Sequence, residues 1–137
     1  MAAELFVDTS AWFALANRRK GEHAKVEPAF LDRLQRGVRI VTTNLVVAET
    51  HALLLHRTSN RAALTFVTEV VVAPTIVVSS TPELEERARR DWLVRYTDQS
   101  FSFTDAVTFA VMRERKIREA LTLDHHFATA GFTMVPG

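Results

Sequence analysis

The chain has no cysteine, and it has only four glycines and four prolines among its 137 residues. Without cysteine there is no disulfide framework, no thiolate nucleophile and no cysteine-ligated zinc or iron–sulfur centre, so oxygen or imidazole must hold any metal. The low glycine and proline content excludes collagen-like and low-complexity classes. What remains is an ordinary globular composition, 47% hydrophobic, which suits a single domain over residues 1–137.

The sequence also lacks segments that would direct it to a membrane. No apolar stretch approaches the length needed to cross a bilayer, and the first residues do not form the basic and apolar segments of a signal peptide. We therefore expect a cytoplasmic protein without membrane contact.

Neither sign of charge dominates, because the chain has 17 Lys and Arg against 16 Asp and Glu. Fourteen of these basic residues are arginine. Arginine suits phosphate contacts, but a compositional bias of the genome explains its excess over lysine equally well.

Short apolar runs alternate with helical periodicity along the whole chain. The runs predict four buried strands and a weaker edge strand, at 5–7, 39–42, 75–78, 120–123 and 132–135. Helices are predicted over about 10–18, 22–36, 45–57, 60–72, 82–96, 103–116 and 125–130. Nearly continuous apolar runs favour a parallel sheet covered on both faces. The predicted fold class is α/β, a three-layer α/β/α sandwich with a central parallel sheet of four to five strands.

Two acidic residues directly follow predicted strands. Asp8 comes after the run at 5–7, and Asp124 comes after the run at 120–123. In an open parallel sheet, ligands bind beyond the carboxyl ends of the strands, near the point where the strand order reverses. Each residue taken alone is equally well explained as the cap of the next helix. Their occurrence at two strand ends of one small sheet favours a shared site.

Two more acidic residues lie on predicted helices. Glu49 lies beside an apolar stripe that includes Val46 and Leu53, so we expect it to be withdrawn from water and to meet a cation or a metal. Asp105 matches a capping box that starts at Ser102, and this local role competes with a place in the same crevice as the strand-end acids.

Four carboxylates gathered in one crevice would need compensation. At 4 Å, each like-charged pair repels by about 4 kcal/mol at an effective dielectric near 20. Such a cluster either takes up protons or binds hard divalent cations, and an all-oxygen site favours Mg²⁺ or Mn²⁺. A carboxylate-held cation activates water and screens the charge that grows on a phosphate. This chemistry suits phosphodiester hydrolysis.

Four segments of the chain carry a family resemblance. They are Phe6-Val7-Asp8-Thr9-Ser10-Ala11-Trp12, Thr43-Asn44-Leu45-Val46-Val47-Ala48-Glu49-Thr50, Ser102-Phe103-Thr104-Asp105-Ala106 and Leu121-Thr122-Leu123-Asp124-His125-His126-Phe127-Ala128-Thr129-Ala130-Gly131-Phe132. Together, in this order and at this spacing, they resemble a PIN-domain ribonuclease. More closely, the chain resembles a VapC-type toxin of a type II toxin–antitoxin system.

The resemblance implies a Mg²⁺- or Mn²⁺-dependent endoribonuclease, with Asp8 and Asp105 as direct metal ligands. Glu49 and Asp124 would complete the site, directly or through water. Ser10 and Thr104 match polar positions that orient these acids. The resemblance further implies an RNA substrate, a cognate antitoxin whose tail enters the active-site groove, and a homodimer. Hydrolysis by such an enzyme leaves a 5′-phosphate and a 3′-hydroxyl.

Other interpretations remain open at this point. A phosphatase with Asp8 as nucleophile fits less well, because Thr9 and Ser10 follow Asp8 and no lysine follows Lys116. A PIN nuclease of RNA processing and a non-catalytic RNA-binding or assembly module of the same fold are the remaining alternatives. His125 and His126 adjoin Asp124, but we interpret them as neighbours of a helix cap and not as ligands.

Overall fold

The fold is built on one parallel sheet of five strands in the order β3-β2-β1-β4-β5. The computed structural model describes residues 3–19, 21–72 and 74–137. The strands are β1 (Glu4–Val7), β2 (Arg39–Thr43), β3 (Thr75–Val78), β4 (Glu119–Leu121) and β5 (Thr133–Val135). Phe6 of β1 pairs with Val41 of β2 on one side and with Ala120 of β4 on the other. The predicted α/β class and the five parallel strands are confirmed.

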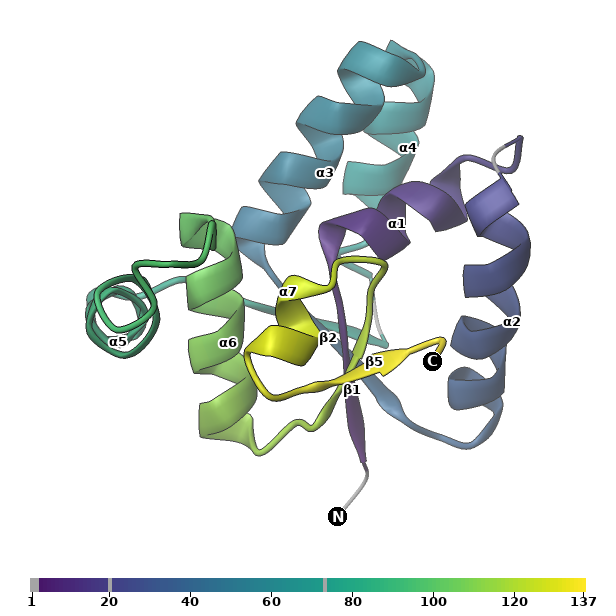
Figure 1. Cartoon of the computed structure of the whole chain (residues 1–137). Coiled ribbons are helices and arrows are strands. Elements are labelled where there is room, and N and C mark those ends of the chain that lie inside the picture. Colours follow the sequence, from purple (N-terminus) through teal and green to yellow (C-terminus); the bar gives the residue numbers. More distant parts are fainter. Residues whose placement is uncertain (1–2, 20, 73) are drawn as a thin grey trace.

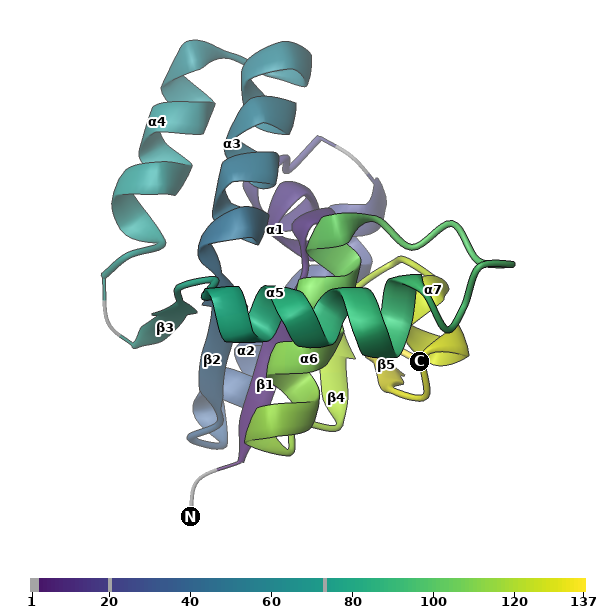
Figure 2. The same ribbon diagram turned by 90° about the vertical axis from the view of Figure 1, so that its left-hand side faces the viewer.

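Seven α-helices are found in the described ranges. They are α1 (Thr9–Ala16), α2 (Gly21–Gln35), α3 (Asn44–Arg57), α4 (Asn60–Glu69), α5 (Pro82–Ala88), α6 (Phe103–Arg115) and α7 (His126–Thr129), with a π-helix at Arg89–Leu93. Helix α6 and helix α5 cover one face of the sheet, and α2 covers the other, whereas α3 and α4 extend as a pair beyond its carboxyl edge (Figures 1 and 2). None of the described helices is long and apolar enough to span a membrane.

The central strands are buried on both faces, which explains their continuous apolar runs. Leu5, Phe6 and Val7 are fully buried. Trp12 of α1 donates a hydrogen bond from Nε1 to the hydroxyl of Thr42 over 3.3 Å, and this hydroxyl donates to the carbonyl of Val7 over 3.0 Å. These bonds satisfy the indole N–H of Trp12 and the hydroxyl of Thr42 in the core.

Capping residues and a glycine mark where several helices begin and end. Thr81 caps α5 by accepting a hydrogen bond from the N–H of Leu84, with proline at the next position, and Thr43 caps α3 in the same way. Gly37 adopts a φ of 77°, a left-handed conformation that ends the chain's helical path after α2. Pro28 lies inside α2, which continues through this residue as one helix.

The strand order defines where a ligand site should lie. From β1 the chain moves outward to β2 and β3, and it then returns to the other side of β1 to form β4 and β5. The order therefore reverses between β1 and β4, and the loops that follow these two strands border a crevice at the carboxyl edge of the sheet. Asp8 and Asp124 lie on these two loops.

Candidate active site

Asp8 lies where β1 ends and α1 begins. Its N–H donates to the carbonyl of Leu121 over 3.1 Å, which continues the pairing of β1 with β4, and its own carbonyl accepts the N–H of Trp12. Its side chain makes no capping hydrogen bond to α1. Instead, Oδ2 accepts hydrogen bonds from the hydroxyls of Thr122 at 3.0 Å and Ser10 at 3.3 Å. The carboxylate is therefore held toward β4 and is not a helix cap.

The environment of Asp8 penalises its negative charge. The side chain is buried, and burial is the largest cause that raises the pKa of Asp8 to about 6. The negative charges of Asp105 and Asp124 raise this pKa further, whereas the nearby backbone N–H of Thr9 and the hydrogen bond from the Thr122 hydroxyl lower it. The three carboxylates are thus close enough to affect one another, as the sequence predicts for Asp8, Asp105 and Asp124.

Two hydroxyl groups tie the ends of β1 and β4 together. The Thr122 hydroxyl, which donates to Asp8, accepts the N–H of Asp124 over 3.0 Å. The Ser10 hydroxyl accepts the N–H of Leu123 over 2.9 Å. Thr122 therefore fixes Asp8 and the backbone of Asp124 at once, a role that the sequence analysis does not anticipate. Its only sequence signal is a hydroxyl side chain inside the apolar run at 120–123.

Asp105 combines two interactions at the start of α6. The capping box is present, since the Ser102 hydroxyl accepts the N–H of Asp105 over 3.0 Å and Oδ2 of Asp105 accepts the N–H of Ser102 over 3.1 Å. The same Oδ2 lies 3.3 Å from Nδ1 of His126. The local and the crevice interpretations of Asp105 are therefore compatible, because the box orients a carboxylate that also borders the site.

Asp124 and His126 form a short turn beyond β4. Oδ1 of Asp124 accepts the N–H of His126 over 2.9 Å and lies 3.5 Å from Nδ1 of the same residue. Ligand atoms of Asp105, Asp124 and His126 all lie within 4.8 Å of one another. His126 does adjoin the start of α7, as the sequence predicts, and its Nδ1 also lies beside two of the acids. The signal for it is the Asp-x-His spacing, which lets one turn hold both side chains together.

Glu49 departs from the expectation of burial. The buried face of α3 is formed by Val46, Thr50 and Leu54, at intervals of four residues, and Glu49 lies about 100° around the helix from Thr50. Its side chain is exposed. The apolar stripe is narrower than the sequence suggests, so the prediction that Glu49 is withdrawn from water is wrong. The roles of Glu49 and Thr104 at the site stay predictions.

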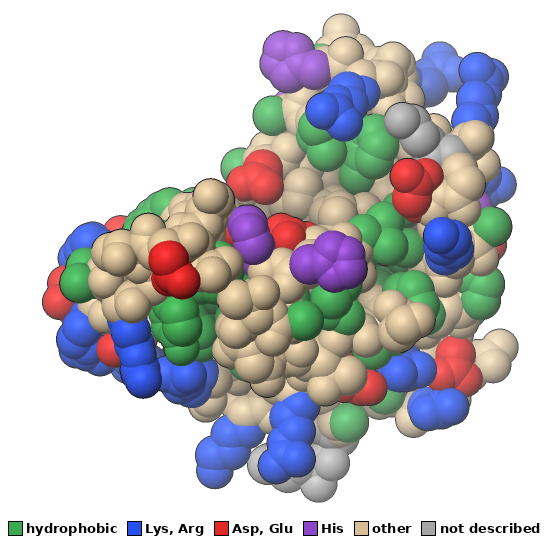
Figure 3. Space-filling model, in the orientation of Figure 1, with side chains coloured by type: hydrophobic (Ala, Val, Ile, Leu, Met, Phe, Trp, Pro, Cys, Tyr) green, Lys and Arg blue, Asp and Glu red, His purple; other side chains and the backbone are tan. Residues whose placement is uncertain are grey.

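The site carries excess negative charge. Within the described ranges, no lysine or arginine side chain forms an ion pair with Asp8, Asp105 or Asp124, and His126 is the only basic side chain paired with the last two. Acidic and histidine side chains lie together near the centre of the face in Figure 3, whereas arginine and lysine side chains lie toward its margins. Because no arginine or lysine partner compensates this charge, the cluster either takes up protons or binds a cation.

The donor set fits a divalent cation. Its ligand atoms within 4.8 Å of one another come from Asp105, Asp124 and His126, and Asp8, whose pKa is raised by the charges of Asp105 and Asp124, adds a third carboxylate beside them. Carboxylate oxygens are the ligands that Mg²⁺ and Mn²⁺ prefer. A buried acid with a raised pKa also gains most from a bound cation, because the cation offsets the desolvation of its charge.

Comparison with known proteins assigns the chain to a family. The family model of the PIN domain matches residues 5–133. The chain therefore belongs to the PIN-domain family.

The similarity to one group of PIN proteins is closer. The chain is 37% identical over 131 residues to the 23S rRNA-specific endonuclease VapC20 of Mycobacterium tuberculosis, covering 96% of this chain and 97% of the relative. The crystal structure of M. tuberculosis VapC20, described as a sarcin–ricin loop cleaving toxin, superposes with a TM-score of 0.82 over 94% of this chain and 96% of that one. The chain is a homologue of VapC-type toxin endonucleases.

Two more distant structures share the fold. VapBC2 of Rickettsia felis, bound to a DNA fragment from its promoter, has a TM-score of 0.70 at 10% identity and covers 96% of each chain. A protein of Pyrobaculum aerophilum has a TM-score of 0.65 at 24% identity over 98% of this chain and 91% of that one. These matches support the arrangement of strands and helices alone.

Proposed function

We propose that this protein is a metal-dependent endoribonuclease, the toxin of a toxin–antitoxin pair, and that it cleaves the sarcin–ricin loop of 23S ribosomal RNA. The observation that carries the proposal is the convergence of Asp8, Asp105 and Asp124 at the switch point of the sheet. It occurs in a chain that is 37% identical to VapC20 over almost its whole length. A non-catalytic module would have no need to keep three mutually repelling carboxylates around a crevice.

In this proposal Asp8, Asp105 and Asp124 hold Mg²⁺ or Mn²⁺, and Glu49 completes the site from α3 directly or through water. A bound divalent cation activates water and offsets the charge that develops on the phosphate. Thr122 and Ser10 keep Oδ2 of Asp8 oriented, and Ser102 does the same for Asp105. Glu49 is exposed and therefore accessible to an RNA strand.

The reaction is an in-line hydrolysis of one phosphodiester bond. The oxygen of water forms a bond to phosphorus while the bond from phosphorus to the 3′-oxygen breaks, and the leaving oxygen takes up a proton. The products carry a 5′-phosphate and a 3′-hydroxyl. The carboxylates of the site would bind the cation, and no side chain forms a covalent intermediate.

A basic cavity lies beyond the far end of α1. It has a volume of about 720 Å³ and is lined in part by Arg18, Arg19 and Arg57. Arginine binds phosphate oxygens through its planar fork. We place the flanking RNA backbone here, one helix length from the acidic cluster, so that an RNA stem spans both regions.

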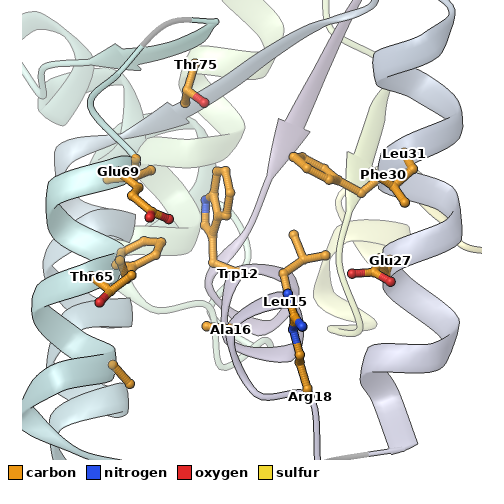
Figure 4. Close-up of a pocket in the computed structure, with 13 residues that line it drawn as sticks. Trp12, Leu15, Ala16, Arg18, Glu27, Phe30, Leu31, Thr65, Glu69 and Thr75 are labelled. Atoms are coloured by element: carbon orange, nitrogen blue, oxygen red, sulfur yellow. The ribbon is translucent and has the colours of Figure 1, made fainter.

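A groove lined by aromatic and aliphatic side chains with polar ones among them lies between α1, α2 and α4. Its volume is about 470 Å³, and Figure 4 shows Trp12 between Glu69 on one wall and Phe30 and Leu31 on the other. A groove of this kind binds the apolar face of an amphipathic helix. Glu27 and Glu69 outweigh Arg18 in the charge of its lining, which favours a helix that carries basic residues. We assign this groove to a helix of the cognate antitoxin, whose tail would enter the separate active-site groove.

The proposed function is tested by mapping RNA ends. Purified protein is incubated with ribosomes in Mg²⁺ or Mn²⁺, and the 5′-ends of 23S rRNA are located by primer extension. The proposal predicts one new 5′-phosphorylated end within the sarcin–ricin loop. Cleavage elsewhere would refute this substrate, and intact RNA at every metal concentration would refute the nuclease. The cytoplasmic location and the homodimer stay predictions, the second tested by light scattering.

A further inference from the structure

We propose that His126 is a ligand of the active-site metal through Nδ1 and that it gives the site a preference for Mn²⁺ over Mg²⁺. The inference rests on the proposed function, because it concerns the same cation. It differs from that proposal in adding a nitrogen donor to a set of carboxylates.

Nδ1 of His126 lies close to two of the carboxylates. This atom lies 3.3 Å from Oδ2 of Asp105 and 3.5 Å from Oδ1 of Asp124. A charge-assisted N–H···O bond is shorter, about 2.7–2.9 Å. Neighbouring donors that share one cation at about 2.0–2.2 Å lie roughly 3.0–3.5 Å apart. The spacing is therefore loose for a hydrogen bond and suits two donors that share one ion with the imidazole.

The imidazole is held in place by interactions that leave Nδ1 facing the carboxylates. The backbone N–H of His126 is bound to Oδ1 of Asp124 over 2.9 Å, which fixes the turn. The ring of Phe101 packs edge-on against the imidazole, with centroids 5.2 Å apart and planes at 85°. Preorganised ligands lose little conformational entropy on binding a metal.

Asp8, Asp105 and Asp124 meet no lysine or arginine partner among the residues that the structure describes, so the cluster attracts a cation and retains it close to Nδ1. An imidazole on this cation favours transition metals, because Mg²⁺ takes oxygen ligands almost exclusively. Mn²⁺ accepts both donor types, and affinity rises along the series from Mn²⁺ to the later metals.

His125 provides a matched control. It is the same residue type one position earlier, it precedes α7, and its side chain is exposed. It does not belong to the group whose ligand atoms lie within 4.8 Å of one another. His125→Gln therefore removes one imidazole beside the site without removing the donor, whereas His126→Gln removes the donor itself.

The experiment is pulsed electron paramagnetic resonance of the Mn²⁺-loaded protein, with titration calorimetry of Mn²⁺ and Mg²⁺ on the same samples. The wild-type protein and His125→Gln should show nitrogen hyperfine coupling to Mn²⁺, and His126→Gln should lack it. We expect His126→Gln to weaken Mn²⁺ binding by about tenfold or more and to change Mg²⁺ binding by less than about threefold. Circular dichroism establishes that each variant is folded.

The outcomes separate the two proposals. Mn²⁺ bound to the wild-type protein without nitrogen coupling, or with coupling that survives in His126→Gln, overturns the role of His126 and leaves the nuclease proposal standing. A wild-type protein that binds no Mn²⁺ and no Mg²⁺ overturns both. Because the wild-type spectrum already decides whether nitrogen is bound, an unstable His126→Gln variant leaves the test intact, and His126→Asn then replaces it.

Discussion

The Thr122 hydroxyl donates a 3.0 Å hydrogen bond to Oδ2 of Asp8, joining the ends of two neighbouring parallel strands. The same hydroxyl accepts the N–H of Asp124. One side chain thus sets the distance between two of the acids that define the crevice. The positions of Asp8 and Asp124 are therefore set by the ends of β1 and β4 and not by a long loop.

Removal of this hydroxyl should loosen the site. We expect Thr122→Val to lower the free energy of unfolding by about 1–3 kcal/mol, because a buried acceptor and a donor lose their partner. RNA cleavage should fall by about 10–100-fold, as is usual when a group that orients a ligand is lost. Denaturant unfolding and cleavage rates test this, with Thr122→Ser as the matched control that restores both. Wild-type cleavage by Thr122→Val would contradict the orienting role.

The raised pKa of Asp8 predicts a pH dependence of stability in the metal-free protein. Asp8 titrates at about 6 when folded and near 4 when unfolded, so the folded chain binds this proton more tightly. Stability therefore falls as the pH rises from about 4 to about 6, and the full penalty, on the order of 2–3 kcal/mol, is present above that range.

The variant Asp8→Asn should remove this penalty. In EDTA at pH 8 we expect it to be more stable than the wild-type protein by about 1–3 kcal/mol, and at pH 3.5 to be equally stable. Chemical denaturation across this pH range measures the difference. A difference that is independent of pH would show that the asparagine acts through packing and not through charge.

The two roles of Asp105 can be separated by a pair of variants. Asp105→Asn keeps an acceptor for the Ser102 N–H, so it should fold with nearly unchanged stability and lose cleavage. Ser102→Ala removes the cap of α6 and should cost about 1 kcal/mol of stability, with cleavage within a few-fold of wild type. Thermal unfolding and cleavage assays compare them. Efficient cleavage by Asp105→Asn would exclude the carboxylate from the chemistry.

The groove assigned to the antitoxin makes a separate prediction. Leu31 lines the groove and is 47% exposed, so Leu31→Glu should weaken antitoxin binding by about tenfold or more while RNA cleavage is unchanged. Leu64 is 64% exposed on α4 and is not among the residues that line the groove. Leu64→Glu serves as the control. Calorimetric binding that is equal for both variants would place the antitoxin elsewhere.

The fold follows from the sequence where one local signal dominates. The strand at Thr75–Val78 is predicted to the residue, and Thr81 with Pro82 predicts the start of α5. The π-helix at Arg89–Leu93 is not predicted, because helical periodicity does not distinguish a π-helical turn from an α-helical one. The fourth strand ends at Leu121 and not at 123, since Thr122 turns its hydroxyl to Asp8 and Asp124 instead of continuing the strand.

The site follows from the sequence only in part. Residues at strand ends are predictable, because parallel strands end at the same edge of the sheet, and Asp8 and Asp124 do converge there. His126 is not, since its position depends on a turn that the bond between Asp124 and its N–H creates. Glu49 is misjudged because the width of a helix's buried face is set by the partners that pack on it, and the sequence does not show these.

The most direct measurement is cleavage of ribosomal RNA by the purified protein after chelation and metal add-back. The account predicts that EDTA stops cleavage, that Mn²⁺ or Mg²⁺ restores it in the wild-type protein, and that neither metal restores it in folded Asp8→Asn. Cleavage that continues in EDTA, or that Asp8→Asn supports at the wild-type rate, would contradict the claim that these clustered acids act by holding a divalent cation.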